Sequence, residues 1–164
     1  REPASQILSL AFPQIGKYKR GGVEQAIQED FMYENTSVFL LLHAARLVGF
    51  SSYSQIYVDP VKQNERDYFS WSEYEWAENQ RRTASSGWTA IHPDFQHRGG
   101  WSLMMDAFDD SLVKSDHLYQ ARQVRKANRY ADKVRARYRD SIVFEKDVID
   151  IGAQTYFRIR IPRE

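Results

Sequence analysis

The chain contains no cysteine among its 164 residues. This absence excludes a disulfide framework, a thiolate-ligated zinc site and a cysteine nucleophile. It agrees with a reducing cytoplasm, where we expect the protein to reside. Histidine is scarce as well, with four residues that do not cluster in H-x-x-x-H or H-x-x-E spacing. The sequence therefore predicts no metal site.

Long hydrophobic runs and flexible linkers are also missing. The most apolar stretch, residues 38–45, is interrupted by His43 and is too short to cross a bilayer, so no membrane span is expected. The 8 glycines and 5 prolines form no linker that would divide the chain. A hydrophobic content of 42% is typical of a globular protein. We expect one domain over residues 1–164, and the sequence leaves open a homodimer or a larger assembly.

A strong overall charge is absent too, because the net charge is +1. Positive charge is concentrated locally, since residues 114–139 hold nine lysines and arginines against Asp116 and Asp132. A basic helix at 122–139 keeps nucleic-acid binding as one alternative function. Its cations lie around all the polar faces rather than in one stripe, so nucleic acid is not the partner we expect.

Helical and strand patterns alternate along the chain. This alternation predicts an α/β protein with a mixed sheet that carries helices on its faces. In the helix expected at 102–112, the apolar spacing predicts an inner stripe of Leu103, Met104, Ala107, Phe108 and Leu112. The other expected helices are 4–14, 23–33, 71–82 and 126–139, and the expected strands are 37–43, 47–58, 88–92, 118–124, 141–144 and 156–161.

The segment from residue 88 to residue 105 carries the clearest chemical signal. It is predicted to be a strand, a turn at Pro93, a loop with Gly99 and Gly100, and then the beginning of a helix. A helix N-terminus offers free backbone N–H groups and a positive dipole end, which together suit a phosphate group. Glycines let the backbone approach an anion closely, and His97 and Arg98 could add charge to the same anion.

The same segment resembles the CoA-binding motif of the GNAT superfamily of N-acetyltransferases, V-x-P-x-x-[Q/R]-x-x-G-x-[G/A]. Ile91, Pro93, Gln96 and Gly99 fall in register with it. Further along, Asn128-Arg-Tyr-Ala131 is similar to the Asn-x-x-Ala of the family. The order of elements also agrees over most of the chain. The resemblance implies an α/β (α+β) fold with a central mixed, mostly antiparallel sheet flanked by helices.

The resemblance implies an N-acyltransferase that uses acetyl-CoA or another acyl-CoA and an amine acceptor that the sequence does not identify. Backbone groups at Ala90 and Ile91 would run beside the pantetheine arm. Backbone N–H groups from Gln96 to Ser102 would hold the pyrophosphate, and Asn128 would face the CoA. The implied cofactor-binding residues are Ala90, Ile91, Gln96, His97, Arg98, Gly99, Gly100, Trp101, Ser102 and Asn128.

In such enzymes a base deprotonates the amine and an acid protonates the leaving thiolate. Arg135 occupies the position at which the family has the tyrosine that protonates the thiolate. Tyr138 follows one helical turn later and is the candidate acid, with a core tyrosine as the alternative. The acidic and aromatic residues 71–78 are either a capped surface helix or a wall of the acceptor pocket. From this segment we take Glu75 as the candidate base.

Two positions depart from the family pattern. Trp101 stands where the family has glycine or alanine, and its size is expected to crowd the pyrophosphate. Arg135 replaces the tyrosine. These departures support a second hypothesis, in which a catalytically degenerate GNAT fold serves as a binding or structural module.

Overall fold

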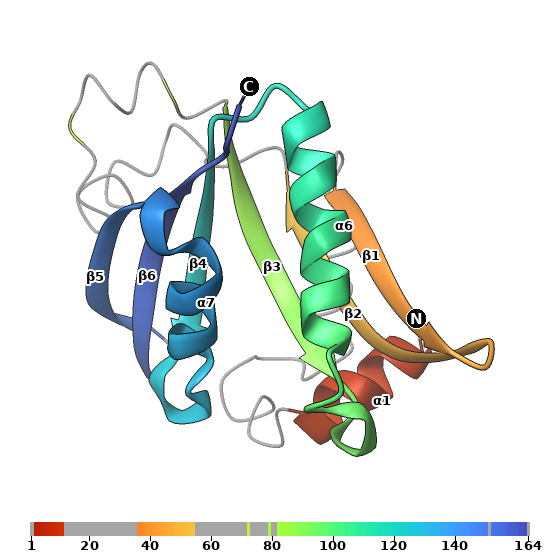
Figure 1. Cartoon of the computed structure of the whole chain (residues 1–164). Coiled ribbons are helices and arrows are strands. Elements are labelled where there is room, and N and C mark those ends of the chain that lie inside the picture. Colours follow the sequence, from red (N-terminus) through yellow and green to blue (C-terminus); the bar gives the residue numbers. More distant parts are fainter. Residues whose placement is uncertain are drawn as a thin grey trace. The chain divides into compact units, whose positions relative to one another are not determined.

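The structure is a computed structural model that describes residues 2–11, 36–54, 72, 79, 82–150 and 152–163 (Figure 1). Six strands form a sheet in the order β1-β2-β3-β4-β6-β5. The strands are β1 (Thr36–His43), β2 (Arg46–Ser54), β3 (Thr83–Ile91), β4 (Tyr119–Arg125), β5 (Ile142–Asp150) and β6 (Gly152–Arg160). The helices are α1 (Glu2–Ala11), α6 (Gly100–Lys114) and α7 (Tyr130–Tyr138), with 3-10 turns η2 (Pro93–Phe95), η3 (Lys126–Asn128) and η4 (Arg139–Ser141).

This architecture confirms the predicted mixed sheet flanked by helices. β1 and β2 are antiparallel, as are β4 and β6, and β5 and β6, whereas β3 and β4 pair in parallel. The expected helix at 23–33 lies outside the described residues, as do most of the expected helix at 71–82 and the end of the expected strand at 47–58.

Several element boundaries differ from the prediction. The helix expected from residue 126 begins only at Tyr130, because Arg129 takes a left-handed conformation with φ of 52° and separates α7 from η3. β3 begins at Thr83, five residues before the expected strand. The strands expected at 141–144 and 156–161 are each nine residues long and form a hairpin that turns at Gly152, where φ is 85°.

The chain divides into two compact units, and the division falls within β3 and within α6. The first unit comprises Arg1–Ser54 and Gly87–Ser111, and the second comprises Gln55–Ser86 and Leu112–Glu164. The prediction of one domain over residues 1–164 stays a prediction. Each unit is described by itself below.

The first unit is built from β1, β2 and the end of β3, with helices on both faces of these strands. On one face, α1 contributes to a cluster of buried apolar side chains. On the other face, Phe108 of α6 lies 5.3 Å from Phe39 and 5.1 Å from Tyr53 between ring centroids. Phe39 pairs with Ser51, the residue next to Phe50 in β2. Because adjacent residues of a strand point to opposite faces of the sheet, Phe39 and Phe50 face different helices. The α1 cluster is Ala4, Ile7, Leu8, Phe50 and Ala90.

The buried stripe of α6 differs in part from the predicted one. Met104, Phe108 and Leu112 are buried as expected, but Leu103 is 63% exposed and Ala107 is also exposed. The helix begins at Gly100, two residues earlier than expected, and therefore includes Trp101 on its inner face, where Met105 is buried as well. Buried side chains then recur at the three- and four-residue intervals of one helical stripe: Trp101, Met104, Met105, Phe108 and Leu112.

The second unit contains β4, β5, β6 and α7, and Figure 1 shows α7 against β4 and β6. Ala121, Val148 and Tyr156 form its apolar cluster, with Phe144 packed against them. Arginines are also part of this interior, since Arg122 is 1% exposed. Four guanidinium groups of the unit lie over aromatic rings: Arg122 and Arg137 over Tyr138, Arg135 over Phe157, and Arg158 over Phe144.

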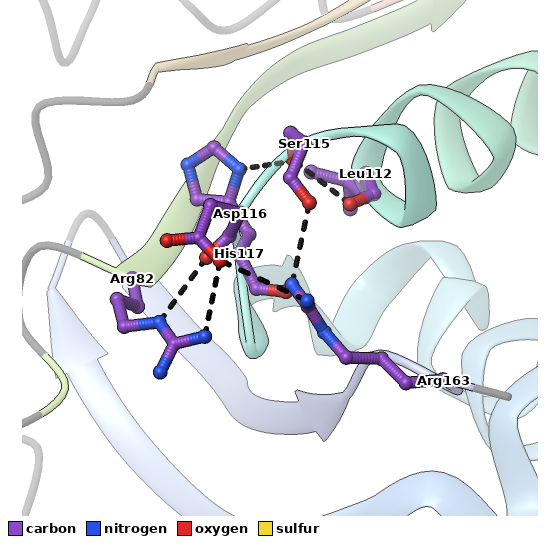
Figure 2. A network of polar contacts seen from close by, with 6 residues as sticks. All are labelled: Arg82, Leu112, Ser115, Asp116, His117 and Arg163. Carbon is purple, nitrogen blue, oxygen red and sulfur yellow. Dashed lines mark hydrogen bonds and ion pairs between the residues drawn. The ribbon is translucent and has the colours of Figure 1, made fainter.

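A network of polar contacts joins the beginnings of β3 and β4 to the C-terminal segment of the second unit (Figure 2). The Arg82 guanidinium pairs with the Asp116 carboxylate at 3.1 Å. Arg163 donates to the carbonyl oxygens of Ser115 and His117. Because three segments that are distant in sequence meet here, the network holds the C-terminal residues against the beginning of β4.

His117 lies inside this network. Ser115 Oγ donates to Leu112 O at 2.7 Å and lies 2.5 Å from His117 Nδ1. Since the serine hydroxyl has one hydrogen, Nδ1 carries a proton and donates to Ser115. Burial lowers the pKa of His117 from its ordinary value of 6.5, Asp116 acts to raise it, and Arg163 acts to lower it.

Candidate functional site

The predicted cofactor-binding residues from Ala90 to Ser102 lie together in the first unit, where β3 passes through a short loop into α6. Ala90 is 3% exposed and belongs to the α1 cluster. The N–H of His92 donates to Val48 O at 2.8 Å, so pairing with β2 continues to the end of β3. Pro93 then ends the strand, because proline has no N–H to donate.

Local hydrogen bonds fix the loop that follows. His92 caps the η2 turn, with its Nδ1 accepting from the N–H of Asp94 at 3.2 Å. Gln96 folds back on the strand, and its Nε2 donates to Ile91 O at 2.9 Å. The Gln96 side chain therefore braces the loop, and its backbone N–H is also engaged, since it donates to Pro93 O at 3.3 Å.

The backbone reaches α6 through two left-handed residues. His97 has φ of 60° and Gly99 has φ of 80°, with the exposed Arg98 between them. The N–H of Leu103 donates to Gly99 O at 3.1 Å, which is the first bond of the helix. Gly100, Trp101 and Ser102 precede this bond and form the first turn of α6. The sequence predicts that this first turn binds an anion, and that role stays a prediction.

Glycine at position 100 has a steric reason. A Cβ built on Gly100 would lie 2.6 Å from Leu41 Cδ2, so β1 packs directly on the first turn of α6. At Gly99 a Cβ would meet nothing within 4 Å, and the positive φ alone favours glycine there. Trp101, the position expected to crowd a pyrophosphate, has a 9% exposed side chain on the inner face of α6.

The remaining predicted residues belong to the second unit or lie outside the described residues. Asn128 ends η3, just before α7, and Tyr138 is the last residue of α7, so the two stand at opposite ends of this helix. Tyr138 is buried, and its ring lies beside the guanidinium carbons of Arg122 at 5.9 Å and Arg137 at 5.6 Å. Glu75 lies outside the described residues.

Arg135, at the family's tyrosine position, is held by carboxylates. Its Nε and Nη2 donate to Glu145 Oε1 at 2.9 and 2.5 Å, and its Nη1 donates to Asp132 at 3.0 Å. The hydrogen bond to Glu145 raises the pKa of Arg135 further above its ordinary value, so it cannot replace a proton-donating tyrosine. Lys126 is paired as well, with Asp147 at 2.6 Å. These pairs neutralise part of the basic segment 122–139.

Sequence reasoning missed His43, which the fold brings to the loop. The His43 ring centroid lies 5.1 Å from that of Phe95. More than fifty residues separate the two along the chain, and the contact depends on the register of β1 with β2, so no local pattern indicates it.

The described residues offer no metal site, since among them no three His, Cys, Asp or Glu side chains gather where they could hold an ion. Within the same residues, no helix has both the length and the apolar character needed to span a bilayer.

No sequence-family model and no curated protein matches the chain. Solved structures do match. The ribosomal-protein-S18-alanine N-acetyltransferase from Escherichia coli is similar over 98% of this chain and 86% of its own, with TM-score 0.63 and 14% identity. Ard1 from Thermoplasma volcanium is similar over 98% and 90%, with TM-score 0.62 and 18% identity. A candidate acetyltransferase of the GNAT family from Desulfovibrio desulfuricans is similar over 96% and 92%, with TM-score 0.60 and 11% identity.

Identities of this size show the fold and nothing finer. The chain has the GNAT fold over nearly its whole length, which confirms the fold that the sequence predicts.

Proposed function

We propose that the chain is an acyltransferase that moves an acyl group from acyl-CoA to an amine acceptor. One observation carries the proposal: the loop after β3 leads through the positive-φ Gly99 directly into the N-terminal turn of α6. The chain shares its fold with acetyltransferases over 96–98% of its length, which supports the same chemistry. The acyl-CoA is acetyl-CoA or a longer homologue, and the acceptor is a small amine, an amino acid, a peptide or a lipid precursor.

In the proposed reaction the cofactor's pyrophosphate binds at the N-terminus of α6, and Ala90 and Ile91 run beside the pantetheine arm. Asn128 is the proposed cofactor contact before α7. A base, for which Glu75 is the candidate, takes a proton from the acceptor ammonium. The free amine attacks the thioester carbonyl, a C–N bond forms, the C–S bond breaks, and the attacking nitrogen loses a second proton to solvent as the amide forms. The departing thiolate takes a proton from an acid, for which Tyr138 is the candidate.

The test is acceptor-dependent release of free thiol from acetyl-CoA and from a medium-chain acyl-CoA, over a panel of amines. We expect release with at least one acceptor and its loss in Gly99→Glu, whose carboxylate repels the phosphates. Gly152→Glu is the matched control, because Gly152 also has positive φ and open space at its Cβ position. Thiol release that does not depend on any acceptor would contradict the proposal.

Tyr138→Phe tests the proposed acid separately. The substitution keeps the ring and its contacts with Arg122 and Arg137 and removes only the hydroxyl. We expect turnover to fall while CoA affinity and thermal stability stay near those of the wild type. A variant that loses stability with turnover, or that keeps full turnover, would assign Tyr138 to the core instead.

The second candidate function, a GNAT fold without catalysis, rests on one observation. Arg135 stands at the family's tyrosine position and is committed to Glu145 and Asp132. A chain that binds CoA but releases no thiol with any acceptor would favour this alternative.

A further inference from the structure

We propose that the turn between β1 and β2 forms a second side of the candidate cofactor site, where His43 and Arg98 bind the ribose 3′-phosphate of coenzyme A. The inference rests on the proposed function, and it assigns a ligand group to two side chains outside the N-terminus of α6. All of the residues that carry it belong to the first unit.

Phe95 is the platform of this surface. Its half-buried ring lies 5.1 Å from the His43 ring and 5.8 Å from the His92 ring between centroids. The Arg98 guanidinium carbon lies 5.7 Å from the centre of the same ring. A guanidinium that rests on an aromatic face keeps the N–H donors along its edge available for an anion. Within the described residues, no ion pair joins Arg98 to a carboxylate.

The turn is held beside the loop by packing and by backbone conformation. Leu41 of β1 fills the space that a side chain at position 100 would need, so β1 contacts the beginning of α6 directly. Ala44 and Ala45 have φ of 47° and 64°, which closes the hairpin tightly after His43. His43 and Arg46 form the last pair of the β1–β2 register. The position of His43 is therefore fixed by the sheet and not by a flexible loop.

The local charge suits a second anion. His43, Arg46, His97 and Arg98 are exposed around the turn and the loop. The only carboxylate between residues 92 and 100 is Asp94, whose backbone is bonded to His92. Coenzyme A carries a phosphomonoester one ribose away from its pyrophosphate, with nearly two negative charges at neutral pH. With the pyrophosphate at the N-terminus of α6, we assign this phosphomonoester to His43 and Arg98, which are exposed in the same unit and share the Phe95 platform.

The experiment compares calorimetric affinities for coenzyme A and for 3′-dephospho-coenzyme A. We expect the wild type to bind coenzyme A at least about tenfold more tightly, because charge-assisted hydrogen bonds each contribute a factor of this order. His43→Ala should weaken binding of coenzyme A and leave binding of the dephospho form unchanged, and Arg98→Ala should weaken binding of coenzyme A more than binding of the dephospho form. Arg98→Lys, which keeps the charge and loses the planar fork, should recover only part of the discrimination.

Arg160→Ala is the matched control, since Arg160 is an exposed arginine of β6. It should leave both affinities unchanged. The side chains of His43 and Arg98 are exposed, so thermal unfolding of the variants should match that of the wild type.

Four outcomes would overturn the inference. Equal wild-type affinity for both ligands would remove the 3′-phosphate contact and leave the proposed function intact. Discrimination that persists in both alanine variants would assign the 3′-phosphate to other contacts. An equal loss of affinity for both ligands would assign His43 and Arg98 to contacts with another part of the cofactor. Failure of either ligand to bind would overturn the proposed function itself, together with this inference.

Discussion

The two units of the chain bury different chemistry. In the first unit, the strands are covered by aliphatic and aromatic side chains, with Phe50 and Phe108 at 0% exposure. In the second unit, Arg122 and Arg158 are buried at 1% and 5% beside aromatic rings. Around them, carboxylates of β5 pair with basic groups, as Glu145 does with Arg135 and Asp147 with Lys126.

The difference teaches where each unit is vulnerable. Apolar packing does not depend on the protonation of any side chain, and in the first unit it supports a loop whose backbone is left-handed at His97 and Gly99. The second unit contains buried hydrogen bonds and more exposed ion pairs, which respond to protonation and to the loss of one partner. The predictions below test this contrast.

The largest effect is expected in the first unit. Phe108→Ala removes a fully buried ring between Phe39 and Tyr53 and should lower the free energy of unfolding by about 3–5 kcal/mol. Leu103→Ala on the same helix is the control, because Leu103 is 63% exposed. Its cost should stay within about 0.5 kcal/mol in chemical denaturation. Similar losses from the two variants would contradict the assigned inner face of α6.

A smaller effect is expected from the buried arginine of the second unit. Arg122→Met should cost about 1–3 kcal/mol, because Gln120 Oε1 loses the donor that lies 2.8 Å away in Arg122. Replacing Gln120 with Leu in the same chain should recover most of this loss. Chemical denaturation of both single variants and the double variant measures the coupling. Additive losses would mean that the hydrogen bond does not govern the stability of this interior.

The pH dependence of the second unit should reveal His117. Its folded-state pKa lies below 6.5, so the unfolded chain binds the proton more readily. Its stabilising contribution is therefore complete above pH 6.5 and decreases as the pH falls below that value. The unfolding temperature should decline more between pH 7.5 and 5 in the wild type than in His117→Gln. Parallel profiles for the two proteins would contradict the burial of the neutral imidazole.

The smallest effect is expected from the ion pair on β5. The hydrogen bond from Lys126 lowers the pKa of Asp147 below its ordinary value of 3.8. The stability from this pair is present above pH 3.8 and is lost as the pH falls through the folded-state pKa. Lys126→Met should therefore begin acid unfolding at a slightly higher pH than the wild type. Because both side chains are exposed, the shift should shrink at high salt.

Local sequence patterns predicted the elements whose signal is contained in one segment. β1 is continuously apolar, and the strand–proline–glycine–helix segment identified the beginning of α6. β5 and β6 were underestimated because Glu145, Asp147 and Gln154 interrupt the apolar pattern, although β5 is the last strand of the sheet and such a strand tolerates charge. The ladder that lengthens both strands is a contact between segments, which periodicity within one segment does not contain.

The candidate site was predictable to the same degree. The loop residues from Ala90 to Ser102 follow from one motif, and the structure brings them together. The brace from Gln96 to Ile91 and the contact of His43 with Phe95 are tertiary. A single sequence without an assigned register indicates neither of them. The roles of Asn128, Tyr138 and Glu75 stay proposals.

The most direct test of the account is calorimetric titration of the chain with acetyl-CoA, with Gly99→Glu and Gly152→Glu measured beside the wild type. Both positions have positive φ and open space around a Cβ, so the two substitutions should strain the backbone alike. The account predicts micromolar binding to the wild type and to Gly152→Glu, and a sharp loss in Gly99→Glu. Wild-type binding that survives Gly99→Glu, or no binding of acetyl-CoA at all, would contradict a cofactor site at the beginning of α6.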